Sequence, residues 1–424
     1  MLSAVFAVLF GLSLLPGRKP LCLRFAERIS DGIVPEGAEA YCRALTWVWF
    51  AVLAFGAAFG GLAACGCLAS FGSWAHLAWL VSPALFVLTF AVERPIRNRR
   101  FRVVFHTSGS TGKSKTIVKT FESLAREVAF HRLHYRESSV PVDGQTAFLG
   151  TVEWNHMYGK LWMDMLPKAM GCVAEPEVIR SPEALVAKMR SAKRVFLVTT
   201  PSFLDRFTRY ADQYDVPQNC VEIVTSGALL PEDVSIRTRQ VFGLEPRQIF
   251  GSTETGGVAS RRGYGAWEVF PSAKVRARPV ADEARPRLAV RSPYSFRGGW
   301  YAMGDAVEID ASGRSFRLFG RADRLVKINE ERVNLGEMEG KVRAAGFPDC
   351  ACVKLAGEHG DCLGLVLVAR SADELAAPPN ALELRRLFYP LFPKGTVPRK
   401  FRFVAELPRN AQGKVVQCEV AKLF

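Results

Sequence analysis

The stretch Val103–Lys115 reads VVFHTSGSTGKSK, a short apolar run followed by a loop of glycine and hydroxyl residues. The run Val103–His106 predicts a β-strand. Beyond the loop, apolar side chains repeat at helical spacing from Phe121 onward, with Thr120 as the expected N-cap. Glycines let backbone N–H groups approach an anion closely, and serine and threonine add donors. The stretch therefore predicts a phosphate-binding loop at the start of an α/β domain.

This loop is not a Walker A motif. That motif requires a glycine five residues before the glycine of its GK pair. Gly112 and Lys113 form such a pair, but Thr107 occupies the earlier position. The P-loop interpretation therefore fails, and a solvent-exposed linker is the alternative to a phosphate-binding loop of another kind.

Five further short motifs follow the loop in a fixed order. They are TSGALLP at 225–231, FGSTETGG at 250–257, WYAMGD at 300–305, GRADRLVK at 320–327 and QGK at 412–414. With the loop, this series resembles the adenylate-forming superfamily of acyl-CoA synthetases, aryl-acid ligases and peptide-synthetase adenylation domains. The resemblance covers roughly residues 103–424. It implies that a carboxylate attacks the α-phosphorus of ATP, expelling pyrophosphate and forming an acyl-adenylate.

The resemblance also implies a role for each matched residue. Glu254 would organise Mg²⁺ and act in catalysis, and Lys414 would be the main adenylation catalyst, because cationic groups and a metal stabilise the charge that builds up on phosphate. Gly227, Ala228 and Phe250 would flank the adenine, Thr253 would contact phosphate, and Asp305 and Arg321 would bind the ribose. The full set of ATP-binding positions is Thr107, Ser108, Gly109, Ser110, Thr111, Gly112, Lys115, Gly227, Ala228, Phe250, Gly251, Thr253, Asp305, Arg321 and Lys327.

The matched family closes with a mobile lid domain that rotates between adenylation and thioester formation. Asp323 matches the hinge position, and residues 333–346 and 363–369 predict a helix and a buried strand of the lid. The family pattern K-x-x-G-x-R has a glycine that lets pantetheine pass. Here Glu330 stands in its place, adding bulk and negative charge to the acceptor tunnel.

The motif NHMYG at 155–159 resembles the acyl-pocket motif of the family. His156 would gate or contact the substrate carboxylate, although a structural histidine beside an aromatic ring is the alternative. We expect three aromatic side chains to line this pocket (Trp154, Tyr158 and Trp162), which favours an aryl or unsaturated acid.

The first 92 residues are unusually apolar. The runs 44–70 and 75–92 are each long enough to cross a bilayer, which needs about 20 apolar residues, and 1–16 is a shorter third run. Buried helices of a soluble domain are the alternative. Arginine and lysine flank these runs at 18–43 and 94–102, so both ends of the predicted hairpin should face the cytoplasm. We therefore expect a protein of the bacterial inner membrane whose catalytic part faces the cytosol.

Charge and cysteine content add little else. The net charge of +15 partly reflects this topology, and no aromatic-basic module predicts nucleic-acid binding. The ten cysteines include no pair of C-x-x-C units, so neither a zinc site nor a disulfide framework is predicted.

The expected fold class is α/β. It comprises two to three transmembrane helices (1–102), an incomplete adenylate-forming large domain of parallel sheets with flanking helices (103–322), and a small α+β lid domain (323–424). A membrane leader on a shortened ligase resembles the ligases of aryl-polyene and fatty-acid-like pathways. The expected function is ATP- and Mg²⁺-dependent activation of an aryl or medium-chain acid, then thioester formation on CoA or the phosphopantetheine of an acyl carrier protein. An adenylation-only enzyme and a non-catalytic membrane scaffold are the alternatives.

Overall fold

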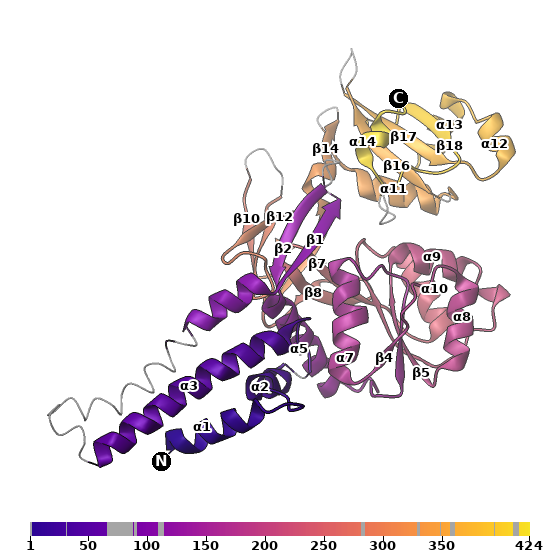
Figure 1. Ribbon diagram of the computed structural model, residues 1–424. Helices are drawn as coiled ribbons and strands as arrows, with labels where there is room; N and C mark the ends of the chain where they lie inside the picture. The colour runs from indigo at the N-terminus through magenta and orange to yellow at the C-terminus, as the bar shows by residue number, and fades with distance from the viewer. Residues whose placement is uncertain are drawn as a thin grey trace.

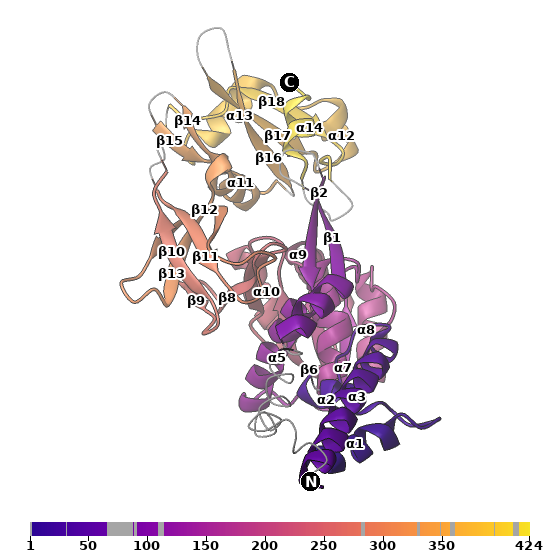
Figure 2. The same cartoon turned by 60° about the vertical axis from the view of Figure 1, so that its left-hand side comes forward.

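The computed structural model describes residues 2–30, 32–65, 88, 91–108, 114–280, 285–328, 331–347, 349–356, 361–393, 395–409 and 415–424 (Figure 1). Three parts follow one another along the chain: an N-terminal helical stalk, a large α/β body and a C-terminal lobe. Figure 2 shows the C-terminal lobe above the body and the stalk extending from the opposite end.

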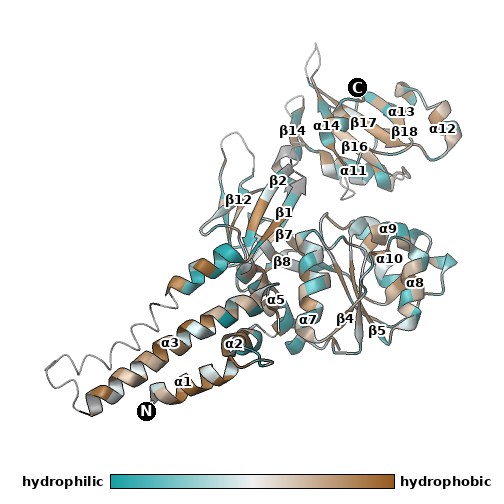
Figure 3. Cartoon of the chain, in the orientation of Figure 1, coloured by the Kyte–Doolittle hydropathy of each residue, from teal (hydrophilic) through white to brown (hydrophobic). Residues whose placement is uncertain are grey.

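The stalk consists of α1 (Leu2–Ser13), α2 (Leu21–Ile29) and α3 (Ala38–Ala64). Within the described residues, one helix is long and apolar enough to cross a membrane, Ala38–Leu62, with a mean hydropathy of 1.8. Figure 3 shows hydrophobic colour along much of α1 and α3. The helix begins six residues before the apolar run at Ala44. The predicted turn at 71–74 and nearly all of the second run lie outside the described residues.

A β-hairpin connects the stalk to the body. β1 (Arg102–Ser108) pairs antiparallel with β2 (Ser114–Thr120), and α5 (Phe121–Glu137) follows directly. The predicted strand, helix and N-cap are confirmed, because the Thr120 hydroxyl accepts a hydrogen bond from the Ser123 N–H at 3.2 Å. The chain after the loop first returns as a strand, however, and Ser108 of β1 lies opposite Ser114 of β2 in this hairpin.

The body contains a parallel sheet with helices on both faces. Its strands are β3 (Thr146–Gly150), β4 (Val173–Ala174), β5 (Arg194–Thr199), β6 (Cys220–Thr225) and β7 (Arg247–Ser252), in the order β4-β3-β5-β6-β7. Side chains of β5 alternate between the two faces, as a strand's two-residue period requires. Phe196 and Val198 pack with α5 and with the helical run of α6 (Met157–Gly159), η2 (Lys160–Met165) and α7 (Leu166–Met170).

The other face of this sheet is covered by α8 (Pro182–Ser191), α9 (Pro201–Arg209) and α10 (Glu232–Phe242), with the short turn η3 (Ala211–Gln213) after α9. Val195 and Leu197 of β5 pack there against Leu185, Leu204 and Phe242. Burial on both faces explains why the strand reads as a continuous apolar run.

The sheet changes direction after β7. β8 (Gly256–Arg262) pairs antiparallel with β7, and the sheet continues through β9 (Trp267–Val269), β13 (Ser315–Arg321), β12 (Tyr301–Ile309), β11 (Arg287–Arg291) and β10 (Lys274–Arg278). The expectation of parallel sheets is therefore only partly right, because this eleven-stranded sheet is mixed. The turn between β7 and β8 marks the change.

The C-terminal lobe has its own core. It follows η4 (Ala322–Arg324) and contains β14 (Leu325–Ile328), β15 (Glu331–Asn334), α11 (Leu335–Ala344), β16 (Cys350–Leu355), β17 (Cys362–Val368), α12 (Ala372–Ala376), α13 (Ala381–Phe388), β18 (Lys400–Val404) and α14 (Gln417–Ala421). Val342, Leu365 and Phe388 are among its buried residues. The predicted lid helix and lid strand are thus present as α11 and β17, although the domain boundary at Asp323 stays a prediction.

We expect Thr120→Ala to lower the free energy of unfolding by about 1 kcal/mol, because the first turn of α5 would lose its N-cap acceptor. Thr120→Ser keeps the hydroxyl and is the matched control. Urea denaturation of both variants is the measurement, and equal losses for alanine and serine would contradict the capping role.

Candidate active site

The phosphate loop joins β1 to β2. Thr107 and Ser108 end β1, and Lys115 is the second residue of β2, directly opposite Thr107 in the register. Gly109, Ser110, Thr111 and Gly112 lie outside the described residues. Figures 1 and 2 both show the hairpin pointing toward the C-terminal lobe. The end of this hairpin, formed by the last residues of β1 and the first residues of β2, therefore lies on the side of the body that faces the lobe.

The turn between β7 and β8 carries Thr253 and Glu254. Ser252 and Thr255 brace it, since each backbone N–H donates to the hydroxyl of the other at 3.1–3.2 Å. The carbonyl of Glu254 accepts a hydrogen bond from the Phe296 N–H at 2.9 Å. The Glu254 carboxylate accepts a hydrogen bond from the Tyr301 hydroxyl. Burial raises the pKa of this hydroxyl, and the negative charge of Glu254 raises it further.

The two predicted ribose ligands lie on neighbouring strands. Asp305 on β12 and Arg321 on β13 are direct cross-strand partners, and Asp305 is 8% exposed. A Cβ atom at Gly304 would lie 2.8 Å from the guanidinium carbon of Arg321, so the guanidinium packs onto this glycine. Glu254 and Arg321 both act on the pKa of Tyr301. The structure thus brings Glu254, Tyr301 and Arg321 into one site.

The predicted adenine-flanking residues lie at the carboxyl ends of β6 and β7. Gly227 has a φ of +93°, a left-handed conformation that favours glycine. The Ser226 hydroxyl donates to the Ile249 carbonyl at 2.9 Å, which fixes the segment containing Gly227 and Ala228 against β7. Phe250 packs 5.4 Å from the rings of both Trp267 and Phe316, whereas a side chain at Gly251 would collide with the Gly256 carbonyl.

The acyl-pocket motif begins a helical run. His156 is the N-cap residue of α6 and is partly exposed, and the Tyr158 hydroxyl donates to the Val224 carbonyl at 2.9 Å. The expectation that Trp162 lines a substrate pocket is not met. Trp162 is 1% exposed and packs 4.4 Å from the His131 ring in the core of the body. The motif therefore supplies His156 to the site region, while Trp162 belongs to the packing beneath it.

Sequence reasoning missed two buried charged groups next to the Glu254 turn. Lys119 on β2 donates to the Thr253 carbonyl at 3.0 Å. Burial lowers the pKa of Lys119 to about 8, although the negative charges of Glu127 and Glu254 act to raise it. Glu127 on α5 accepts from the Gly257 N–H at 2.7 Å, and burial raises its pKa. The available signal was a lysine at an inward position of an alternating strand.

Four other predicted positions belong to the C-terminal part. Asp323 falls in η4, and Lys327 lies on β14 opposite Arg332 of β15. Glu330 and Lys414 lie outside the described residues. Arg409 and Val415 flank the QGK motif and pair as an antiparallel β-bridge.

This site fits a magnesium ion whose ligands come largely from the substrate phosphates. Among the residues that the structure describes, no group of three or more His, Cys, Asp and Glu side chains could hold a metal ion without other ligands. Mg²⁺ in nucleotide sites usually takes one or two carboxylates together with phosphate and water oxygens. The partly exposed Glu254 can supply one such carboxylate.

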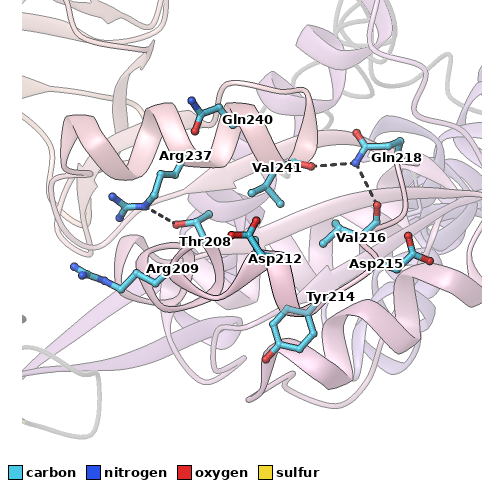
Figure 4. Close-up of a pocket in the computed structure, with 11 residues that line it drawn as sticks. Thr208, Arg209, Asp212, Tyr214, Asp215, Val216, Gln218, Arg237, Gln240 and Val241 are labelled. Carbon is cyan, nitrogen blue, oxygen red and sulfur yellow. Dashed lines mark hydrogen bonds between the residues drawn. The ribbon is translucent and has the colours of Figure 1, made fainter.

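A surface cleft of about 660 Å³ lies elsewhere, between α9, η3 and α10 (Figure 4). Its two guanidinium groups are engaged in ion pairs, Arg237 with Asp205 and Asp233, and Arg209 with Asp205. None of the predicted site residues lines this cleft. We therefore assign the candidate site to the Glu254 region.

Comparison with known proteins identifies the family. The model of the AMP-binding enzyme family matches residues 68–287, just over half of the chain. The chain belongs to this family. The match begins 35 residues before Val103, inside the region predicted to be membrane-embedded, so the predicted membrane fusion and the missing front subdomain are not confirmed.

Two curated relatives illustrate the similarity. The 4-coumarate–CoA ligase of Rhodobacter capsulatus is 26% identical over 319 residues, which cover 75% of this chain and 76% of the relative. Delta-poly-L-ornithine synthetase of Acinetobacter baumannii is 27% identical over 355 residues, covering 74% of this chain but 25% of that protein. The chain thus spans a quarter of one relative and about three quarters of the other.

A solved structure shows the same fold. The O-succinylbenzoate coenzyme A synthetase of Bacillus subtilis, in complex with ATP and a magnesium ion, superposes with a TM-score of 0.62 at 18% identity, over 75% of this chain and 69% of that one. The α/β fold of adenylate-forming enzymes is therefore confirmed.

We expect Gly304→Ala to weaken ATP binding about tenfold, because the new methyl group displaces the Arg321 guanidinium from its place beside Asp305. Gly298→Ala is the matched control, since a Cβ atom there meets nothing within 4 Å. Calorimetric titration with MgATP is the measurement. Equal affinities of the two variants would contradict the placement of Arg321 in the nucleotide site.

Proposed function

We propose that this protein activates a carboxylic acid with ATP through an acyl-adenylate and then forms a thioester. The observation that carries the proposal is the convergence of Glu254, Tyr301, Asp305 and Arg321, with Glu254 in the turn that follows the carboxyl end of β7. Ligands of α/β folds bind beyond the carboxyl ends of such parallel strands. Membership of the AMP-binding enzyme family supports it.

Each described group has a physical task in this reaction. Arg321 and Asp305 orient the ribose, since one carboxylate accepts hydrogen bonds from two hydroxyls. Glu254 would hold Mg²⁺, and the ion would neutralise charge on the phosphates. Tyr301 orients the Glu254 carboxylate through its hydrogen bond. Lys115, on the strand that leaves the phosphate loop, supplies a cation near the phosphates.

The proposed substrate is an aryl or a medium-chain acid, and the acceptor is CoA or an acyl carrier protein. The similarity to a 4-coumarate–CoA ligase supports an aromatic acid. Glu330, at the position where the family has a tunnel glycine, favours a carrier protein that brings its arm in at another angle. An adenylation-only enzyme is the second candidate, because the same glutamate would obstruct thioester formation if it enters the acceptor tunnel.

A pyrophosphate-release screen over aryl, β-hydroxy and medium-chain acids tests the first step. Supplying CoA or carrier protein to the acyl-adenylate then separates the candidates. Thioester with either acceptor supports the proposed ligase, and release of adenylate without thioester supports the adenylation-only enzyme. Absence of pyrophosphate release with every acid in the presence of MgATP would refute both.

We expect Lys414→Ala to abolish pyrophosphate exchange while ATP affinity stays near that of the wild type. The mutation removes a cation proposed to act in the transition state, and one such group contributes about 10²–10³-fold in rate. Lys422→Ala, which removes another lysine from the end of the lobe, is the matched control. Exchange at the wild-type rate by Lys414→Ala would refute the assignment.

We also propose that the stalk anchors the protein in the bacterial inner membrane with the catalytic part in the cytosol. The apolar helix Ala38–Leu62 and exposed apolar side chains on α1 and α3, such as Phe6, Leu9 and Phe55, support this. Basic residues cluster at the body side of these helices, as the positive-inside rule requires for a cytosolic body.

We expect Phe55→Asp to reduce the fraction of protein that stays with membranes after alkaline extraction, because a carboxylate near the middle of a span costs about 2.5–3.5 kcal/mol. Tyr210→Asp alters an exposed aromatic on the body (53% exposed, against 64% for Phe55) and should leave retention unchanged. A reporter fused after Phe424 should be active only as a cytosolic type. Periplasmic activity, or equal retention of both variants, would contradict the anchor.

A further inference from the structure

Lys119 is a fully buried lysine, with 0% of its surface exposed, near the end of β2. Its ammonium nitrogen donates to the Thr253 carbonyl at 3.0 Å and lies 3.4 Å from the Met157 sulfur. Removing an ammonium group from water is costly unless other groups compensate for the lost hydration. A lysine at this depth therefore needs partners that also keep it in one place.

Glu127 provides the opposing charge from α5. It is 2% exposed, and the charges of Lys119 and Glu127 act on each other. One carboxylate oxygen accepts from the Gly257 N–H at 2.7 Å, whereas the other has no hydrogen-bond partner among the described residues. A Cβ atom at Gly256 or Gly257 would lie 2.6 or 2.9 Å from this carboxylate, so glycine at both positions permits the approach.

The two charged groups contact opposite ends of the same turn. Lys119 contacts the carbonyl of Thr253 at its start, and Glu127 contacts the N–H of Gly257 at its end. Glu254 lies between these two points. Lys119 is also on the strand that leaves the phosphate loop. The pair therefore connects the loop hairpin, helix α5 and the turn that bears Glu254.

We propose that Lys119 and Glu127 are positioning residues that fix the Thr253–Glu254 turn relative to the β1–β2 hairpin. This inference rests on the proposed function, because it assigns Glu254 to the magnesium ion of MgATP. An apolar side chain at 119 would fill the same volume but would leave the Thr253 carbonyl without its donor. The turn would then be free to shift, and the Glu254 carboxylate would shift with it.

The test compares Lys119→Met, the double variant Lys119→Met/Glu127→Gln and the control Glu222→Gln. Glu222 is 1% exposed on β6 and pairs at 2.7 Å with the partly exposed Arg262, so its substitution also removes a buried, paired carboxylate, but away from the turn. For each protein we would measure the melting temperature, the affinity for a non-reactive α,β-methylene analogue of ATP, and the Mg²⁺ concentration that half-saturates analogue binding.

We expect Lys119→Met to raise the half-saturating Mg²⁺ concentration by about tenfold or more, the usual effect of losing a group that orients a metal ligand. The double variant leaves no unpaired buried charge, so its melting temperature should return toward that of the wild type while its Mg²⁺ requirement stays raised. Glu222→Gln should lower the melting temperature and keep the wild-type Mg²⁺ requirement.

A wild-type Mg²⁺ requirement in the double variant would overturn the proposal, and so would failure of this variant to fold, since the pair would then serve folding alone. The outcome is distinct from failure of the proposed function. Analogue binding is measured without turnover, so a wild-type protein that binds the analogue but activates no acid would refute the function and leave the positioning role standing.

Discussion

The arrangement of the site depends on the close contact between the Glu127 carboxylate and the glycines that open β8. At this point the sheet changes from parallel to antiparallel, and a turn must leave one strand and enter the next beside a helix. Gly256 has a φ of +72° and has no side chain, so α5 can approach the backbone and supply an acceptor to the Gly257 N–H. The positions of Thr253 and Glu254 follow from how this turn is held.

The parts of the fold that obey a simple period were predictable from sequence. The strand before the phosphate loop, the capped helix α5, the lid helix α11 and the lid strand β17 all combine regular apolar spacing with clear ends. β2 was not predicted, because its sequence SKTIVKT alternates with a lysine on the inward side. The start of α3 was also missed, since its first turns contain Glu39 and Arg43 and lie outside the apolar run.

The candidate site divides in the same way. Glu254, Asp305 and Arg321 were predicted because each lies in a short motif whose residues keep a fixed spacing. Lys119 and Glu127 have no such motif, and charged residues are rarely buried, so sequence reasoning assigns them to the surface. The prediction for Trp162 was wrong in the opposite direction, because it placed a core residue at the site. An aromatic residue near a pocket motif suggested a substrate contact, but helical geometry turns it into the core of the body.

The junction between stalk and body is stiff. Glu122, in the first turn of α5, pairs with Arg94 at 2.8 Å and accepts a hydrogen bond from Asn98 at 3.0 Å, while Tyr41 of α3 contacts the Phe101 ring. β1 begins at Arg102, immediately after these contacts. A short rigid spacer of this kind differs from a flexible linker, whose end-to-end distance grows with its length. If the stalk is seated in a bilayer, the β1–β2 hairpin is held at one height and one orientation above the lipid surface. An amphiphilic acid dissolved in that bilayer would then reach the enzyme by diffusion in two dimensions, at an effective concentration set by the membrane rather than by the cytosol.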